Sequence, residues 1–303
     1  MLKRLASRLL PAFALISLAV AAPSCKKGET AEGDAPGGAQ GDTSTPAADG
    51  ISLRYKPGAT KLKESGKLSL TLSGPQSGSM AIDITGTLDV TDSGADALKV
   101  AFKIDEVRDV SFGGAFEPKP KEGEEPKDPK ESLLKASGAR IIDMRGETDE
   151  DATKALAENK KPEGEQGGGM TESVGEFLGL PELPEMGLKL GESITVEKED
   201  EQDLGGLKIP IDEESKYTLV KIDDSSGKRL AEVTIETEGS GAIELPQGGG
   251  LLSIDQVAEV RMIFNLDDQI PVSLHVEQTS AFSAGSQGGG ETQVTIDATY
   301  EAL

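Results

Sequence analysis

Downstream of Gly50, apolar and polar residues alternate with a period of two in many short stretches of the chain. The clearest stretch runs from Met80 to Val90, where every second residue is apolar or glycine and Asp or Thr holds most positions between them. A period of two puts successive side chains on opposite faces of a strand, so one face is expected to be buried and the other to face water. The pattern predicts a mainly β protein with antiparallel strands.

The same alternation predicts further strands at 51–55, 68–72, 98–104, 140–144, 194–196, 217–222, 230–235, 260–266, 270–276 and 294–300. Turns are predicted at Asp92-Ser93-Gly94, Ser225-Ser226-Gly227 and Asp267-Asp268, because these residues favour turn conformations. Gly86 in mid-strand indicates a bend or bulge, and Pro271 indicates an edge strand or a bulge. We therefore expect antiparallel meanders that form a curved sheet, a half-barrel or a sandwich.

One or two short helices are predicted between two strand-rich parts. The stretch 148–151 has the Thr-x-x-Asp spacing of a capping box and is expected to open a helix through Leu156. A second helix is predicted over 172–178, because a glycine and a proline follow it. The stretch 112–130 contains four prolines among lysines and glutamates, and it predicts a solvated loop.

These elements divide the chain into an N-terminal β half at 51–145, a middle part of loops and short helices at 146–187 and a C-terminal β half at 188–303. The stretches 88–104 and 219–235 share a layout of strand, Ser-Gly turn and strand. An internal duplication into two similar halves is one interpretation of this likeness. The other is that any two β-hairpins look alike.

The first residues have the layout of an export signal. Lys3, Arg4 and Arg8 precede an apolar stretch from Leu9 to Val20, and small residues follow it. This stretch is shorter than the roughly 20 residues that a membrane-spanning helix needs. The sequence therefore predicts a signal peptide at 1–24.

Cys25, the single cysteine of the chain, follows this signal. The segment Ala22-Pro23-Ser24-Cys25 resembles the lipobox of bacterial lipoproteins, and the resemblance implies that Cys25 becomes the first mature residue and carries acyl chains. Residues 26–50 contain no Val, Ile, Leu, Met or aromatic residue, so they cannot bury enough apolar surface to fold. Residues 25–50 are therefore expected to be a lipid anchor and a disordered tether. The alternative is plain secretion with Cys25 as an ordinary thiol.

The composition narrows the range of partners. A formal net charge of −23 over 303 residues argues against binding to nucleic acid and to anionic lipid surfaces. The absence of tryptophan, with three tyrosines and seven phenylalanines, leaves little aromatic surface for stacking on sugars or bases. The expected partners are the membrane, reached through the N-terminal lipid, and an envelope protein or an apolar ligand.

A second resemblance rests on short motifs in the region after the tether. Leu53-x-Tyr55 lies in the first predicted strand, and Leu180-Pro181-Glu182-Leu183-Pro184 precedes Gly191-Glu192-Ser193. Together with the lipobox and the tether, this order is similar to a family of exported bacterial proteins known only as a domain of unknown function. The resemblance spans most of 50–303 and implies a β-rich exported domain. It assigns no catalytic residue.

No catalytic, cofactor-binding or metal-binding residue is identified in the sequence. His275 is the only histidine, and it alternates with Val272, Leu274 and Val276, so we expect it on the surface and not as a catalytic base. A Gly-x-Ser-x-Gly motif is absent, and a zinc site would need several His or Cys ligands. The runs of three glycines lack the Lys-Ser/Thr of a phosphate-binding loop, and we interpret them as connections between strands.

Two acidic clusters, at 197–203 and 147–151, are the remaining candidates for a site. Calcium takes about six to eight oxygen ligands, which such clusters can supply. The stretch from Asp89 to Val100 has glycine at the sixth position, but Val100 stands where an EF-hand has its glutamate. We therefore expect both clusters to be solvated and not to bind calcium.

These observations favour a membrane-anchored envelope lipoprotein with a non-enzymatic binding or structural role. A curved sheet offers a concave face for an apolar ligand, by analogy of fold alone. The alternative is an envelope hydrolase that uses carboxylates or a metal, suggested by the abundance of Asp and Glu. Lys26 stands after Cys25 in place of an Asp retention signal, which favours the outer over the inner membrane.

Overall fold

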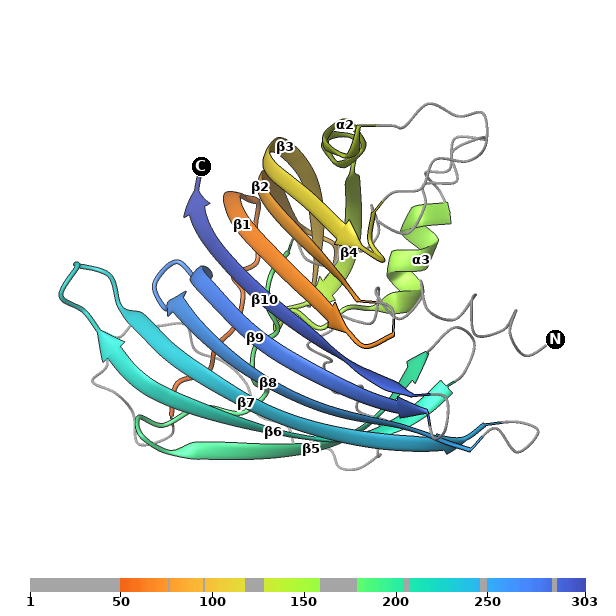
Figure 1. Ribbon diagram of the computed structural model, residues 1–303. Helices are drawn as coiled ribbons and strands as arrows, with labels where there is room; N and C mark the ends of the chain where they lie inside the picture. Colours follow the sequence, from red (N-terminus) through yellow and green to blue (C-terminus); the bar gives the residue numbers. More distant parts are fainter. Residues whose placement is uncertain are drawn as a thin grey trace.

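The first and last strands of the fold lie side by side in one antiparallel sheet. A computed structural model describes residues 50–75, 77–94, 96–117, 128–158, 179–203, 208–245, 250–284 and 288–303. Within these ranges ten strands follow one another in the order β4-β3-β2-β1-β10-β9-β8-β7-β6-β5. The sheet is strongly curved, and Figure 1 shows its strands as long bent arrows from β3 to β5. The expected curved antiparallel sheet is therefore confirmed.

The elements have the following bounds: β1 Thr60–Ser73, β2 Gly78–Asp92, β3 Ala97–Gly114, α2 Pro129–Leu134, β4 Ser137–Asp143, α3 Glu150–Glu158, β5 Ser193–Asp203, β6 Lys208–Asp223, β7 Leu230–Glu244, β8 Leu251–Asn265, β9 Ile270–Ala284 and β10 Gly289–Ala302. Strands β1 to β4 come from the predicted N-terminal half and β5 to β10 from the C-terminal half. Pairing of β1 with β10, from Leu62 opposite Ala302 to Ser73 opposite Glu291, joins the two into one continuous sheet.

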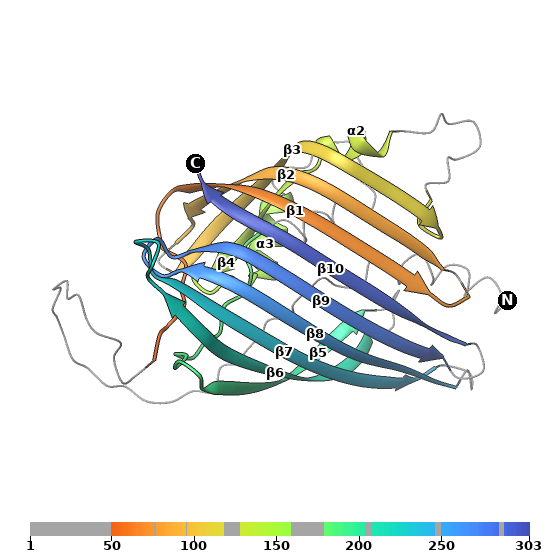
Figure 2. The same cartoon turned by 60° about the vertical axis from the view of Figure 1, so that its left-hand side comes forward.

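One face of the sheet is apolar, and we call it the inner face. It carries the largest buried side chains, among them Leu62, Leu88, Leu98 and Phe264, each 0 or 1% exposed. Figure 2 shows α3 behind the front strands, beside the edge strand β4. The opposite face, which we call the outer face, carries the polar residues of the alternating pattern. One apolar and one solvated face are what the period of two predicts.

The predicted first strand at 51–55 is wrong, although its residues are buried as expected. Leu53 and Tyr55 are 1% and 3% exposed, but only Ile51 forms a bridge, to Leu188. The Tyr55 N–H donates to the carbonyl of Met144 at 2.7 Å. This segment alternates because it packs as extended coil against the inner face, where alternate side chains point into the core.

A second coil segment lies against the same face, and we call residues 179–190 the inner segment. Its Leu180, Leu183 and Leu188 are 6%, 1% and 1% exposed and belong to the main apolar core. The Leu183 N–H donates to the carbonyl of Arg145 at 2.7 Å. The inner face is thus covered by the chain's own leucines.

Both irregularities predicted from single residues are present. The pairing of β2 with β3 shifts register between Asp83 and Ile84 and again between Thr85 and Gly86. The pairing of β8 with β9 shifts between Ile263 and Phe264, opposite Pro271. Strand β9 lies between β8 and β10, so Pro271 marks a bulge and not an edge. Bulges increase local twist and bend a sheet, which suits its curvature.

The helices differ in detail from the prediction. The cap of α3 is Asp149, whose Oδ1 accepts from the Ala152 N–H at 2.9 Å, whereas Thr148 forms a bridge with Ile142. The predicted loop at 112–130 is wrong at both ends, because β3 continues to Gly114 and α2 begins at Pro129. The helix predicted at 172–178 lies outside the described residues.

The inner segment generates a prediction about stability. Replacing Leu183 by Ala removes a fully buried side chain and should lower the free energy of unfolding by about 2–5 kcal/mol. Met186, in the same segment but 48% exposed, provides the control, and Met186→Ala should change it by less than about 0.5 kcal/mol. Urea denaturation of the two variants measures both values. Equal, small losses would mean that the inner segment does not cover the core in solution.

Candidate functional site

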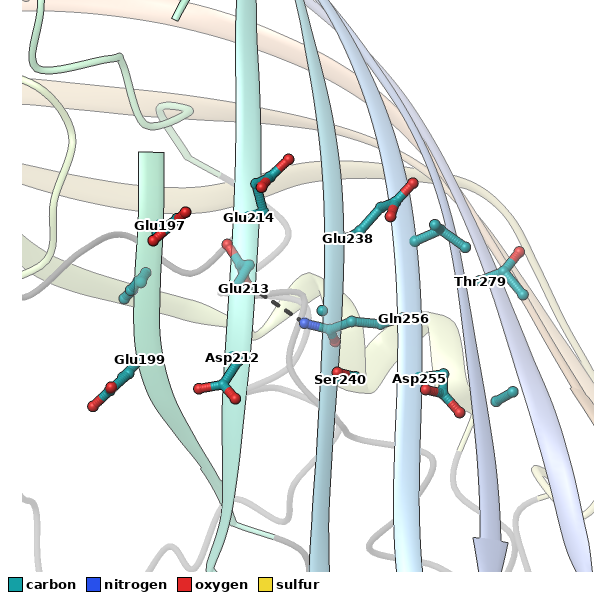
Figure 3. A pocket seen from close by; sticks show the side chains of 14 residues that line it. Glu197, Glu199, Asp212, Glu213, Glu214, Glu238, Ser240, Asp255, Gln256 and Thr279 are labelled. Atoms are coloured by element: carbon teal, nitrogen blue, oxygen red, sulfur yellow. Dashed lines mark hydrogen bonds between the residues drawn. The ribbon is translucent and has the colours of Figure 1, made fainter. Parts of the chain in front are cut away.

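A shallow hollow lies on the sheet over β5 to β9. Its volume is about 780 Å³, and most of the side chains that line it belong to the outer face. Figure 3 shows them in two rows that cross the strands. Seven carboxylates line it, together with one lysine and smaller residues: Glu197, Glu199, Asp212, Glu213, Glu214, Glu238, Asp255, Lys198, Gly239, Ser240, Gln256, Val257, Thr279 and Ala281. Val257 is half exposed at 50%, so one apolar side chain is accessible within an acidic surface.

Strand register puts several of these carboxylates directly opposite one another. Glu197 pairs with Glu214, and Glu214 pairs with Glu238 on the next strand. Glu199 likewise stands opposite Asp212. Like charges directly opposite each other on neighbouring strands lower stability. The outer face of β5 to β8 therefore bears a concentration of negative charge that folding alone would not favour.

The two acidic clusters predicted from sequence have different positions. The cluster at 197–203 lies on β5, where Glu197 and Glu199 line the hollow and Glu201 forms an ion pair with Lys208. The cluster at 147–151 lies beyond β4 at the start of α3 and takes no part in the hollow. No group of three or more His, Cys, Asp or Glu side chains within the described ranges is arranged to hold a metal ion.

Arg145 organises the carboxylates that follow β4. Its guanidinium lies 3.2 Å from Asp143, 3.4 Å from Glu147 and 3.5 Å from Glu185. Burial, and next the negative charge of Glu147, raise the pKa of Glu182 to about 8. The Asp143 Oδ1 also accepts from the N–H groups of Arg145 and Glu147, at 2.7 and 3.0 Å. These contacts stabilise a tight turn. The ion pairs with Arg145 explain why carboxylates gather here, so the cluster needs no bound ligand.

A buried glutamate on the inner face was missed by the sequence analysis. Glu64 of β1 is 0% exposed, and its carboxylate oxygens make no hydrogen bond of good geometry, although the Tyr300 hydroxyl and the Gly179 N–H lie close to them. Burial raises its pKa to about 8, although the positive charge of Arg140 acts in the opposite direction. Glu64 is therefore protonated at neutral pH. The available signal was its phase, because it alternates with Leu62 and Leu68 in the apolar register.

Two tyrosine hydroxyls hold the inner segment. Tyr300, opposite Glu64 on β10, donates to the carbonyl of Gly179 at 2.9 Å, and Tyr55 donates to the carbonyl of Pro181. Arg140 lies so close that a Cβ added to Gly179 would be 1.4 Å from its Nη2. A side chain at position 179 would therefore require the Arg140 guanidinium to move. The polar groups thus fix the inner segment against the sheet.

His275 lies on the outer face, as predicted. Its Nδ1 is 2.7 Å from Asp297 and its Nε2 3.3 Å from Glu277, and its side chain is 36% exposed. The hydrogen bond with Asp297 is the main cause of the raised pKa of His275. In these contacts the imidazole faces two carboxylates and no nucleophilic side chain. Its neighbours are those of a surface ion-pair network.

The proposed lipid attachment site, Cys25, lies outside the described residues together with the signal and the tether. Within the described ranges, no helix is both long enough and apolar enough to cross a membrane.

Comparisons with known proteins add little to this geometry. No protein-family model matches the chain, and no curated protein matches it at a significant level. Among solved structures, an outer membrane channel from Pseudomonas putida F1 aligns with 82% of this chain and 98% of the channel chain. The identity is 10% and the TM-score 0.23, and a TM-score this low carries no argument about fold or function.

Glu64 generates a prediction about pH. The carboxyl ionises near pH 4.5 in the unfolded chain but near 8 in the folded chain, so the unfolded state binds fewer protons between these values. Stability contributed by this group is therefore lost as pH rises from about 4.5 to about 8, by up to about 1.4 kcal/mol per pH unit. Glu64→Gln should be more stable than the wild type at pH 8 and nearly equal to it at pH 4.5.

Urea denaturation at several pH values between 4.5 and 8.5 measures this slope. Glu301→Gln, on the exposed side of β10, provides the control and should leave the wild-type slope unchanged. If Glu64→Gln keeps the wild-type slope, Glu64 is not buried as a neutral carboxyl.

Proposed function

We propose that this chain is a membrane-anchored lipoprotein of the bacterial cell envelope with a non-enzymatic binding or structural role. The support for the anchor is the order of segments at the N-terminus: a basic start, an apolar stretch, small residues and then Cys25. Each buried methylene of an acyl chain contributes about 0.8 kcal/mol, so several chains on one cysteine hold a protein firmly on a membrane. The 25 residues from Lys26 to Gly50 would then separate the sheet from the membrane by roughly 25–30 Å.

In this proposal the outer face of the sheet is the binding surface, and its partner is a protein. The observation that carries this choice is the packing of the inner face, where Leu53, Leu180, Leu183 and Leu188 occupy the space that an apolar ligand would need. The outer face instead offers a hollow of about 780 Å³ lined by seven carboxylates and one lysine. A partner with a cationic surface complements this charge, and charge complementarity favours fast and selective association.

The outer membrane is the proposed location. Lys26 follows Cys25, where an Asp would be expected to retain some lipoproteins at the inner membrane. Separation of the two membranes tests this part of the proposal, and recovery with the inner membrane alone would reverse it.

The anchor predicts a specific mass. Protein purified from its native membrane should begin at Cys25 and carry the added mass of acyl chains, because the cysteine is the attachment point. The Cys25→Ser variant should lack this added mass and leave the membrane fraction. Intact-mass spectrometry measures both forms. An unmodified mature chain in the soluble fraction would contradict the anchor and make this a secreted protein.

The packed inner face predicts little affinity for apolar ligands. Titration of the delipidated protein with a fluorescent fatty acid should give a signal that rises without saturation, since the leucines of the inner segment already cover the core. Serum albumin serves as a positive control for the probe. Saturable binding at one site per chain, lost in a variant of the inner face such as Leu183→Ala, would support a carrier of apolar ligands instead.

A further inference from the structure

The inner segment lies on the sheet as coil, and from 179 to 187 it forms no bridge with a strand. Hydrogen bonds to separate elements hold this part: Tyr300 to Gly179, Tyr55 to Pro181 and Leu183 to Arg145. At Leu188 the segment joins the coil around Ile51 through a pair of backbone hydrogen bonds, 2.7 and 2.8 Å long. Residues 179–187 can therefore leave the sheet by a local opening that breaks none of its strand pairs.

A buried carboxyl, Glu64, lies where the inner segment begins. Its oxygens make no hydrogen bond of good geometry, and the Gly179 N–H lies close to them. The titratable and charged groups that face it are Arg140 from β4 and Tyr300 from β10, while Gly86 stands opposite on β2. Among these neighbours only Gly179 lies outside the sheet. Opening of the inner segment is therefore the local motion that can bring water to the Glu64 carboxyl.

A second buried carboxyl, Glu182, belongs to the inner segment itself. The groups that face it are Asp143 of β4, Arg145 and Glu147 beyond β4, Lys198 of β5, Tyr217 of β6 and Tyr55 of the coil. Lys198 and Arg145 favour a charged Glu182, but burial and the two nearby carboxylates outweigh them, since its pKa is raised to about 8. Opening of the inner segment would also bring water to this carboxyl.

We propose that the inner segment is a strap operated by protons: it closes over the inner face while Glu64 and Glu182 are neutral, and it opens when they are charged. Opening gives both carboxylates water and uncovers the part of the core under Leu180 and Leu183. The inference goes beyond the proposed function, because it depends neither on the lipid anchor nor on a partner at the outer face.

Alkaline pH favours the open form. In the open form each carboxyl ionises near its ordinary value of 4.5, whereas in the closed form the pKa of each is raised to about 8. The open form therefore binds fewer protons between these two values, and protonation keeps the segment closed at the acid end. From pH 5 to pH 8 each carboxyl should raise the equilibrium constant for opening by at least about a hundredfold.

Hydrogen exchange of single amides, followed by NMR, tests the proposal on the mature chain from residue 25 with Cys25→Ser. The Leu183 N–H, bonded to the Arg145 carbonyl, reports opening of the inner segment, and the amides of β1 and β10 report unfolding of the sheet. Dividing each rate by the intrinsic rate at the same pH gives an opening constant. For Leu183 this constant should rise at least about a hundredfold from pH 5 to pH 8 and stay above those of the strand amides.

Matched variants assign the pH dependence to the two carboxyls. Glu64→Gln and Glu182→Gln each replace a carboxyl by a neutral amide of similar size, so each should reduce the rise and the double variant should abolish it. Glu185→Gln, in the same segment but with a side chain that is 60% exposed, provides the control and should keep the wild-type rise. Circular dichroism checks that each variant folds. Glu182→Gln alone still tests the proposal if the core substitution at position 64 prevents folding.

Other outcomes overturn the inference. Equal opening constants for Leu183 and for the amides of β1 and β10 would mean that the inner segment leaves only when the whole sheet unfolds. An opening constant of Leu183 that is independent of pH, or that rises equally in the wild type and the double variant, would mean that these carboxyls do not control the segment. All of these results would leave the proposed anchor and outer-face partner standing, because mass spectrometry and binding measurements test those separately.

Discussion

The leucines of the inner face remain out of water because coil segments of the same chain lie against them. A curved sheet that does not close must have its apolar face covered, since exposed apolar area costs about 25 cal/mol per Å². Here the residues around Leu53 and the inner segment around Leu183 provide this cover, and both are almost fully buried. The rest of the structure depends on how these segments are held. They use backbone bonds to Leu188 and Arg145 and the hydroxyls of Tyr55 and Tyr300.

The same packing brings an acidic side chain into the core. Glu64 occupies an apolar position between Leu62 and Leu68, and its protonation avoids a buried charge. Gly86 stands opposite Glu64 on β2, where the absence of a side chain leaves space on that side. A core leucine at position 64 would satisfy the sheet equally well by packing alone. Glu64 therefore makes the stability of the fold depend on pH.

Much of the fold could be predicted because alternation reflects burial directly. It located every strand of the C-terminal part, but it also gave a false strand at 51–55. The bulges were indicated by single residues, Gly86 and Pro271. Alternation reports which side chains are buried and not which backbone groups pair, and extended coil on a packed face has the same pattern. The pairing of β1 with β10 could not be predicted, because no local signal in either strand specifies so distant a neighbour.

The acidic hollow and Glu64 differ in what the sequence revealed about them. Glu197 and Glu199 were recognised as part of an acidic cluster, but their alignment with Glu214 and Glu238 depends on strand register. Register is set by the whole sheet and cannot be obtained from composition. Glu64 could have been found from its phase within 62–72. The surroundings of its carboxyl could not be found in this way, since they depend on the positions of Arg140 and Tyr300.

The neighbour of β1 has a consequence for the order in which the chain can fold. Synthesis from the N-terminus presents residues 60–73 early, but the strand that pairs with their free edge comes from residues 289–302. Until that last segment is available, the middle of the sheet lacks a strand and the two halves cannot join. Contacts so distant in sequence form slowly. This topology postpones completion of the sheet to the end of the chain.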